Sequence, residues 1–109
     1  MSFGGFRSVW IMVMFDLPTD TKTARRSYQN FRKILLENGF LMLQFSIYAR
    51  PCPSEDNSKV HFIKIKNNLP PEGEVRILQI TDKQYERTQI FQGKSRKPTE
   101  PTPLQLTFF

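Results

Sequence analysis

The segment SVWIMVMF, residues 8–15, restricts the fold more than any other, because it is apolar at nearly every position. It is rich in residues that favour β-strands, and it is too short for an ordinary helix before the Asp-Leu-Pro sequence that follows. A strand points alternate side chains to opposite faces of its sheet, so both faces of this strand are expected to be buried. Something must therefore cover each side of it.

The rest of the chain predicts a short series of helices and strands. Residues 19–39 have a capping Thr at the start, an apolar stripe at helical spacing and Gly39 at the end, which predicts a helix. Residues 40–50 alternate apolar and polar side chains and predict a strand. The other predicted elements are a helix over 54–69, a strand over 75–81 and a short strand over 88–91. This order fits an α+β, ferredoxin-like βαββαβ sandwich if residues 88–91 supply the closing strand.

The second predicted helix begins at a capping residue, Ser54, and its apolar residues Phe62, Ile65 and Leu69 recur at helical spacing. His61 lies in the same helix without a Cys or a second His near it, so we expect it to be structural rather than catalytic.

Composition along the chain divides it into three parts. Residues 1–93 are expected to form one domain, because a chain of 109 residues supports a single modest core. Residues 94–103 contain three prolines and no large apolar side chain, which predicts a linker. In LQLTFF, residues 104–109, apolar and polar side chains alternate, which predicts a terminal strand that docks on another surface through Leu104, Leu106 and Phe108.

The apolar first strand also predicts self-association. Two helices on one side of a sheet cover only that side, and Trp10, Met12 and Met14 share one face of the strand. A second copy of the sheet would bury them, which predicts a two-fold homodimer with these residues in its interface. The alternatives are an exposed patch near a sheet edge, or LQLTFF folded back over this face.

Asp16 ends the apolar segment at the same parity as Met12 and Met14. In the predicted dimer, the two-fold axis would bring Asp16 of both copies into one cleft. Two carboxylates are the minimum for holding Mg²⁺, which also takes water and phosphate oxygens. On the residues alone, the simpler interpretation is that Asp16 caps the turn DLPTD through its own backbone.

The charge of the chain favours a polyanionic partner such as nucleic acid. Sixteen Lys and Arg residues against ten Asp and Glu give a net charge of +6. Several cations lie on the polar side of the helix over 19–39, where few acids can neutralise them. Such a stripe suits contacts to phosphates, although a solvated helix face has the same pattern. The cations are Lys22, Arg25, Arg26, Arg32 and Lys33.

Other classes of function lack their sequence signals. The chain has no Ser-His-Asp arrangement, glycine-rich phosphate loop or zinc motif, and residues 75–81 offer no aromatic side chain for base stacking. No apolar run is long enough for a membrane span, and the N-terminus lacks the pattern of an export signal. A cytoplasmic protein without a membrane partner is expected.

The segment MVMFDLPTDTKTARRSYQNFRKILLENGFLMLQFSIYAR, residues 12–50, resembles the start of the small spacer-acquisition protein of CRISPR systems, the partner of the CRISPR integrase. The matching features are an apolar first strand ending in Asp, the D-L-P-T turn, a basic helix containing F-R-K-x-L-L, then G-F and Q-x-S-x-Y-x-R. ITDKQYER, residues 80–87, is similar to members found beside type II effectors. The resemblance covers residues 8 to about 93.

This resemblance implies a ferredoxin-like homodimer that bridges integrase dimers across a double-stranded prespacer. It implies that Asp16 is the metal-binding and catalytic residue in members with Mg²⁺-dependent nuclease activity on RNA or DNA. It also implies that LQLTFF pairs with a neighbouring sheet and helps to hold the integrase. The residues that resemble contacts to the DNA backbone are Lys22, Arg25 and Arg26, followed by Arg32, Lys33 and Arg50.

Three hypotheses for the function follow. The first is a non-catalytic scaffold of CRISPR adaptation that binds duplex DNA and recruits the integrase through its terminal strand. The second is a metal-dependent endonuclease that cuts RNA or DNA with Asp16 paired across the dimer. The third is a basic ferredoxin-like regulator, or a toxin-like RNA-binding dimer, without catalysis.

Overall fold

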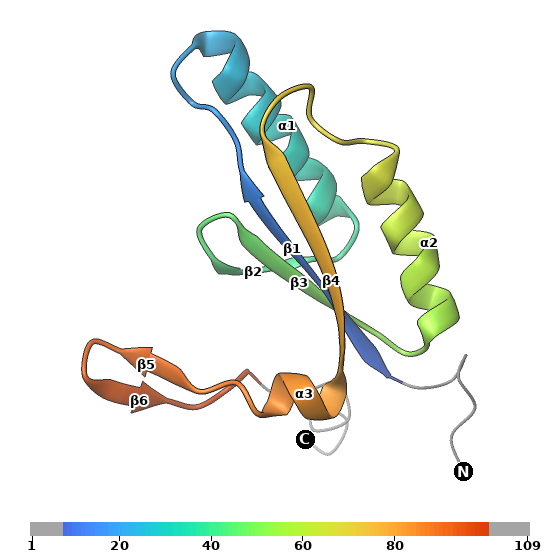
Figure 1. Ribbon diagram of the computed structural model, residues 1–109, viewed down its shortest axis with the longest axis vertical. Coiled ribbons are helices and arrows are strands. Elements are labelled where there is room, and N and C mark those ends of the chain that lie inside the picture. Colours follow the sequence, from blue (N-terminus) through green and yellow to red (C-terminus); the bar gives the residue numbers. More distant parts are fainter. Residues whose placement is uncertain (1–7, 101–109) are drawn as a thin grey trace.

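In the computed structural model, which describes residues 8–100, a four-stranded antiparallel sheet carries two helices on one face (Figure 1). This unit consists of β1 Val9–Asp16, α1 Lys22–Glu37, β2 Leu41–Gln44, β3 Ile47–Cys52, α2 Glu55–Lys66 and β4 Glu74–Thr81. The strands lie in the order β2-β3-β1-β4. The fold is therefore of the ferredoxin-like α+β class, as the sequence predicts. No helix within residues 8–100 is long and apolar enough to cross a membrane.

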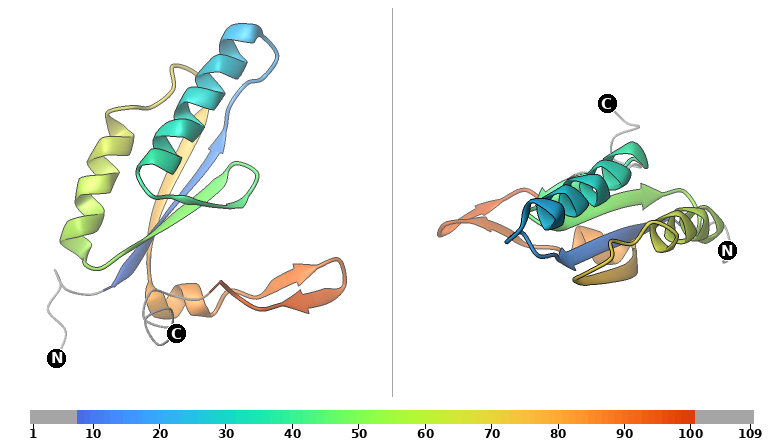
Figure 2. Two further views of the ribbon diagram at one scale, coloured as in Figure 1. Left: turned by 180° about the vertical axis from the view of Figure 1, so that it is seen from behind. Right: turned by 90° about the horizontal axis from the view of Figure 1, so that it is seen from above.

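The predicted first strand is the centre of the sheet. β1 pairs with β3 on one side and with β4 on the other, both antiparallel. Seen from behind, α1 and α2 both lie in front of the sheet (Figure 2, left). They cover the face to which the odd-numbered residues of β1 point. The main core comprises Val9, Ile11, Val13, Phe15, Leu17, Phe31, Leu35, Phe40, Tyr48, Cys52 and Ile65.

The ends of α1 follow the sequence signals. Thr21 caps the N-terminus, where its Oγ1 accepts a hydrogen bond from the Ala24 backbone N–H at 3.0 Å. Gly39 follows the C-terminal cap with φ 81, a left-handed conformation that glycine adopts without steric cost.

Residues 40–50 form a hairpin and not the single strand that the sequence predicts. β2 and β3 are joined by a tight turn at Phe45 and Ser46. Ser46 has φ 65, a conformation that is uncommon for residues other than Gly, Asn and Asp. Because the turn lacks the usual turn residues, the alternation of side chains runs through it unbroken and conceals it.

The hairpin changes how the sheet is completed. Since β2 and β3 are separate strands, β4 closes the sheet, and residues 88–91 are not its closing strand. After β4, a short helix α3 Asp82–Glu86 leads to a separate hairpin of β5 Ile90–Gln92 and β6 Ser95–Lys97. This hairpin projects from one end of the sheet (Figure 1). The segment 94–103, predicted to be a linker, thus includes β6, and the predicted docking strand over 104–109 lies outside the described residues.

The side of α2 that meets the sheet differs from the one that its apolar spacing predicts. The buried residues of α2 are Ser58, His61 and Ile65, whereas Phe62 is 42% exposed. Ser58 Oγ is hydrogen-bonded to Gln79 Oε1 of β4 at 2.6 Å. A polar contact therefore fixes this helix against the edge of the sheet, and apolar spacing alone cannot reveal it.

Candidate functional site

Asp16 ends β1 with an exposed side chain. The register of β1 with β4 places Glu74 directly opposite Asp16, and opposite residues of an antiparallel pair point to the same face. The backbone here is closely packed, because a Cβ atom at Gly73 would lie 2.6 Å from the Asp16 carbonyl oxygen. Two carboxylates of one chain therefore share the face away from α1 and α2. Glu74 lies 58 positions after Asp16 in the sequence, so no local pattern predicts the pair.

The pair of carboxylates is an incomplete metal site. Oxygens of Asp16 and Glu74 are the ligand type that Mg²⁺ prefers, but this ion takes six ligands. Glu74 also accepts a hydrogen bond from Arg76 Nε at 2.7 Å. No group of three or more His, Cys, Asp and Glu side chains that could hold a metal ion occurs between residues 8 and 100. A bound ion would need water, a substrate phosphate or carboxylates from a second copy to complete its shell.

The alternative role for Asp16, capping of its own turn, has no support in the described residues. Among residues 8–100, no hydrogen bond joins the Asp16 carboxylate to the turn DLPTD. The carboxylate is thus available to a ligand.

The basic residues at the start of α1 lie on its outer side. Lys22, Arg25 and Arg26 are exposed, and none of them forms an ion pair within residues 8–100. Arg25 Nη1 donates to the Thr19 carbonyl oxygen at 3.1 Å, which holds this side chain near the loop after β1. These three cations form a compact positive surface at one end of the molecule, and we call them the α1 cations.

The remaining predicted phosphate contacts are placed less favourably. Arg32 is half-buried, and Lys33 Nζ lies 3.8 Å from Glu37 Oε1, which partly neutralises it. Arg50 is half-buried and donates from Nη1 to the Asn38 carbonyl oxygen at the end of α1. Its guanidinium also fills the space beside Gly39, where a Cβ atom would collide with it. The structure therefore assigns Arg50 to the C-terminus of α1 rather than to the surface of the α1 cations.

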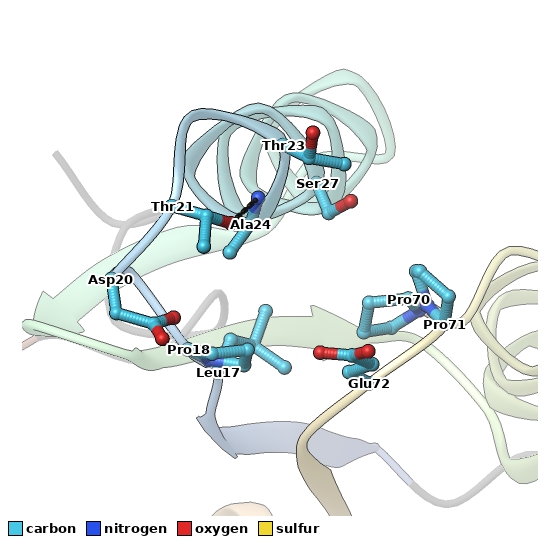
Figure 3. A pocket seen from close by; sticks show the side chains of 10 residues that line it. All are labelled: Leu17, Pro18, Asp20, Thr21, Thr23, Ala24, Ser27, Pro70, Pro71 and Glu72. Carbon is cyan, nitrogen blue, oxygen red and sulfur yellow. Dashed lines mark hydrogen bonds between the residues drawn. The ribbon is translucent and has the colours of Figure 1, made fainter.

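A hollow of about 270 Å³ lies between the loop after β1 and the loop before β4, below the start of α1. Figure 3 shows the carboxylates of Asp20 and Glu72 pointing into it from opposite sides, with Thr23 and Ser27 on the helix above. Two carboxylates without an intervening cation repel a phosphate group. An anionic ligand should therefore bind the outer side of α1 and avoid this hollow.

The face of the sheet opposite α1 and α2 is covered at one end only. There Trp10 stacks on Tyr85 of α3, with ring centroids 3.9 Å apart, and is only 2% exposed. Trp10 thus has its partner within the chain, which leaves it little surface for a second copy, contrary to our expectation. Met12 and Met14 are half-buried, and the neighbouring Leu78 is 46% exposed. The β5–β6 hairpin faces this region only across a hollow that Met12 and Phe91 border, so much of the middle of the sheet stays uncovered within residues 8–100.

The fold and this site define the class: a small, basic, ferredoxin-like α+β protein whose central strand ends in an exposed acid and whose first helix carries exposed cations. Comparison with known sequences gives the family. The sequence model of the family described as CRISPR associated protein Cas2 matches residues 9–88. The chain belongs to the Cas2 family.

Several relatives align along nearly their whole length. The protein from Parvibaculum lavamentivorans is 50% identical over 93% of this chain and 100% of its own. Those from Flavobacterium psychrophilum and Paracidovorax avenae are 47% and 45% identical, over 95% and 96% of this chain and 90% and 97% of theirs. All three are named CRISPR-associated endoribonuclease Cas2.

Proposed function

We propose that this chain is a cytoplasmic scaffold of CRISPR adaptation, which binds double-stranded prespacer DNA and bridges dimers of the integrase. The α1 cations carry this proposal. Lys22, Arg25 and Arg26 are exposed and unpaired within residues 8–100, and they lie together at the start of one helix. Cations in this arrangement bind phosphates by releasing counterions from the duplex and read no base sequence. Membership of the Cas2 family supports a role in CRISPR adaptation.

The scaffold acts as a homodimer formed through the uncovered middle of the sheet. The exposed Leu78 and the half-buried Met12 and Met14 supply apolar surface there. A hollow of about 380 Å³ adjoins it, bordered by Ile47 and by Phe91 of the projecting hairpin. A second copy of the sheet would bury this surface and bring a second Asp16 to the same side.

Replacing Met14 by Asp tests the dimer. The variant should sediment as a monomer at concentrations where the wild type is a dimer, because a carboxylate would be buried in an apolar interface. Leu36→Asp, on the exposed side of α1, is the matched control and should leave the dimer intact. A dimeric Met14→Asp protein would contradict this arrangement.

DNA binding is tested by replacing Arg25 and Arg26 together with Gln. Each lost phosphate contact reduces the slope of log affinity against log salt by about 0.9, so the double variant should lose up to about two units of slope. Lys64→Gln with Lys66→Gln, on α2, is a control of equal charge and should bind duplex DNA as the wild type does. An unchanged slope in the α1 variant would show that these residues form an ordinary solvated helix face.

Recruitment of the integrase is assigned to the terminal residues Leu104, Leu106 and Phe108, whose predicted strand could add to a sheet of the integrase. Deleting residues 101–109 should release the integrase in a co-purification while leaving duplex binding intact. Co-purification at the wild-type level would contradict this role for the terminus.

A second candidate function is that of a Mg²⁺-dependent endoribonuclease or endonuclease. Two observations favour it: the exposed Asp16 lies opposite Glu74, and the relatives are named endoribonucleases. Where Mg²⁺ binds, these carboxylates would hold it, and the ion would polarise a phosphodiester and activate water.

Asp16→Asn should abolish Mg²⁺-dependent cleavage of RNA or DNA but preserve duplex binding and spacer acquisition. Loss of acquisition in a correctly folded variant would contradict the scaffold, and undiminished cleavage would contradict the nuclease.

A further inference from the structure

Phe45 is the large apolar residue with the most exposed side chain in the described part of the chain. It is 88% exposed at the tip of the hairpin between β2 and β3, whereas the next, Phe91, is 58% exposed. A phenylalanine ring left this open to water forgoes most of the stabilisation that burial would provide. The ring therefore contributes little to the stability of the fold.

The turn that carries Phe45 is nevertheless firmly fixed. Ser46, the next residue, has φ 65, a conformation that a residue with a Cβ atom adopts at an energetic cost. The Ser46 carbonyl oxygen accepts a hydrogen bond from the Phe15 backbone N–H at 3.0 Å. Ser46 Oγ also lies 3.3 Å from the Tyr28 hydroxyl of α1. These contacts fix the tip of the hairpin to the end of β1 and to the first helix.

This ring lies at the same end of the sheet as Asp16. The pairing of β1 with β3 ends at Met14 and Ile47, and the turn that holds Phe45 is joined to the end of β1 by the bond from the Phe15 N–H to the Ser46 carbonyl oxygen. On its other side, Asp16 is paired with Glu74 of β4. Phe45, Asp16 and Glu74 line a common hollow of about 320 Å³, together with Arg76. An aromatic ring, two carboxylates and a guanidinium thus border a space large enough for one nucleotide.

We propose that Phe45 is a base-stacking residue, which holds an unpaired nucleobase of a single strand so that the adjoining phosphodiester lies at Asp16. Aromatic rings stack on any base, and only unpaired bases are free to leave their own stack. Arg76 also lines the hollow; its Nε donates to Glu74, and its exposed side chain leaves the other guanidinium nitrogens free to meet a phosphate. RNA and DNA offer the same stacking chemistry. The inference rests on the proposed nuclease site for its location, but the stacking itself requires no cleavage.

The test uses the full chain in EDTA, so that no cleavage occurs, with single-stranded RNA and DNA oligonucleotides carrying 2-aminopurine. Stacking on Phe45 should quench the fluorescence of this base. Phe45→Ala should weaken single-strand binding about 5- to 150-fold, the equivalent of one aromatic stack, and abolish the quenching. Phe45→Trp should retain both, and Phe62→Ala, 42% exposed on α2 at the other face of the sheet, should bind as the wild type does. Duplex affinity should not change in any of these variants.

The outcomes separate this inference from the nuclease proposal. Unchanged single-strand affinity and quenching in Phe45→Ala would overturn the inference, as would a shift of this variant from dimer to monomer in sedimentation. A loss of binding confined to RNA would support stacking and identify RNA as the ligand. Asp16→Asn should still quench 2-aminopurine. If Asp16→Asn also cleaves at the wild-type rate, the nuclease proposal fails while the stacking role of Phe45 stands.

Discussion

The two faces of the sheet are built in different ways. The face under α1 and α2 is closed by a continuous set of buried aromatic and aliphatic side chains that includes Phe15, Phe31 and Leu35. The opposite face is closed only where Trp10 meets Tyr85, and its far end has an exposed acid, Asp16. A single strand, β1, contributes to both. One face therefore supplies most of the stability, and the other leaves surface for binding.

Phe31→Ala tests the helix-covered face and should have the largest effect. Phe31 is 1% exposed and packs edge-on against Phe15 with ring centroids 5.2 Å apart, so its loss should reduce the free energy of unfolding by about 3–5 kcal/mol. Urea denaturation followed by circular dichroism measures this. Leu36→Ala, on the same helix but 42% exposed, should cost less than about 1 kcal/mol. Equal losses would contradict the assignment of α1 to the core.

Gly73→Ala tests the packing behind Asp16 and should have the next largest effect. Gly73 has φ 94, and a Cβ atom would also meet the Asp16 carbonyl oxygen. Gly93 has φ 63 with nothing within 4 Å of an added Cβ atom, so Gly93→Ala isolates the conformational cost of about 1–2 kcal/mol. Thermal unfolding should show a greater loss for Gly73→Ala than for Gly93→Ala. Equal losses would mean that the backbone at this end of the sheet shifts to accommodate the added Cβ atom at little energetic cost.

Tyr85→Phe tests the covered end of the open face. The Tyr85 hydroxyl donates to Glu100 Oε2 at 3.0 Å, and burial of the ring raises the pKa of this hydroxyl. Losing the bond should cost about 1 kcal/mol, while the Phe ring keeps the stack on Trp10. A double-mutant cycle with Glu100→Ala should give a coupling free energy of similar size. Additive effects of the two substitutions would show that the contact contributes nothing.

His61, on the helix-covered face, should make the free energy of unfolding depend on pH. This is the smallest effect among the four stability tests. Burial is the largest cause of the lowered pKa of His61, and the positive charges of Arg50 and Lys64 lower it further. The unfolded chain then binds more protons than the folded one just below the ordinary pKa of about 6.5. The contribution of neutral His61 to the free energy of unfolding is complete above a pH of about 6.5. It is lost as the pH falls through the pKa of the folded state, by at most about 1.4 kcal/mol per pH unit.

Unfolding titrations between pH 5 and 7.5 measure this dependence. His61 is the single histidine of the chain, so His61→Leu should flatten the profile over this interval. A profile that keeps its slope in the variant would assign the pH dependence to other groups.

The sequence predicted the helix-covered face better than the open one. The apolar residues of β1 and the capping residues of α1 are strong local signals. The structure confirms the strand and the helix that they predict. The hairpin turn at Phe45 and Ser46 carries no Gly, Pro, Asn or Asp, and Ser46 alone is a weak turn signal inside an unbroken alternation. α3 did leave a signal, because Thr81 and Gln84 form a capping box that is visible as T-x-x-Q in the sequence. The helix that begins at this capping box carries Tyr85, the residue that covers Trp10.

The candidate site was predicted only in part. Asp16 stands out because it terminates an apolar strand, which is a local pattern. Glu74 reaches Asp16 through the register of β4, and Phe45 shares a hollow with Asp16 because of the hairpin turn after β2, and neither can be read from local sequence patterns. For Arg50, which the family resemblance implies as a phosphate contact, the structure shows a bond to the Asn38 carbonyl oxygen at the end of α1, a contact between distant residues that no local pattern reveals.

The central position of β1 also has a consequence for synthesis of the protein. Within this sheet β1 is synthesised before the other three strands, yet one of its edges stays open until β4 is made, since Val9 pairs with Thr81. Until then, a stretch of eight residues with seven apolar side chains has an unsatisfied backbone edge, a state that favours aggregation. The nascent chain therefore depends on early docking of α1 and the β2–β3 hairpin to shield the strand around which the sheet is assembled.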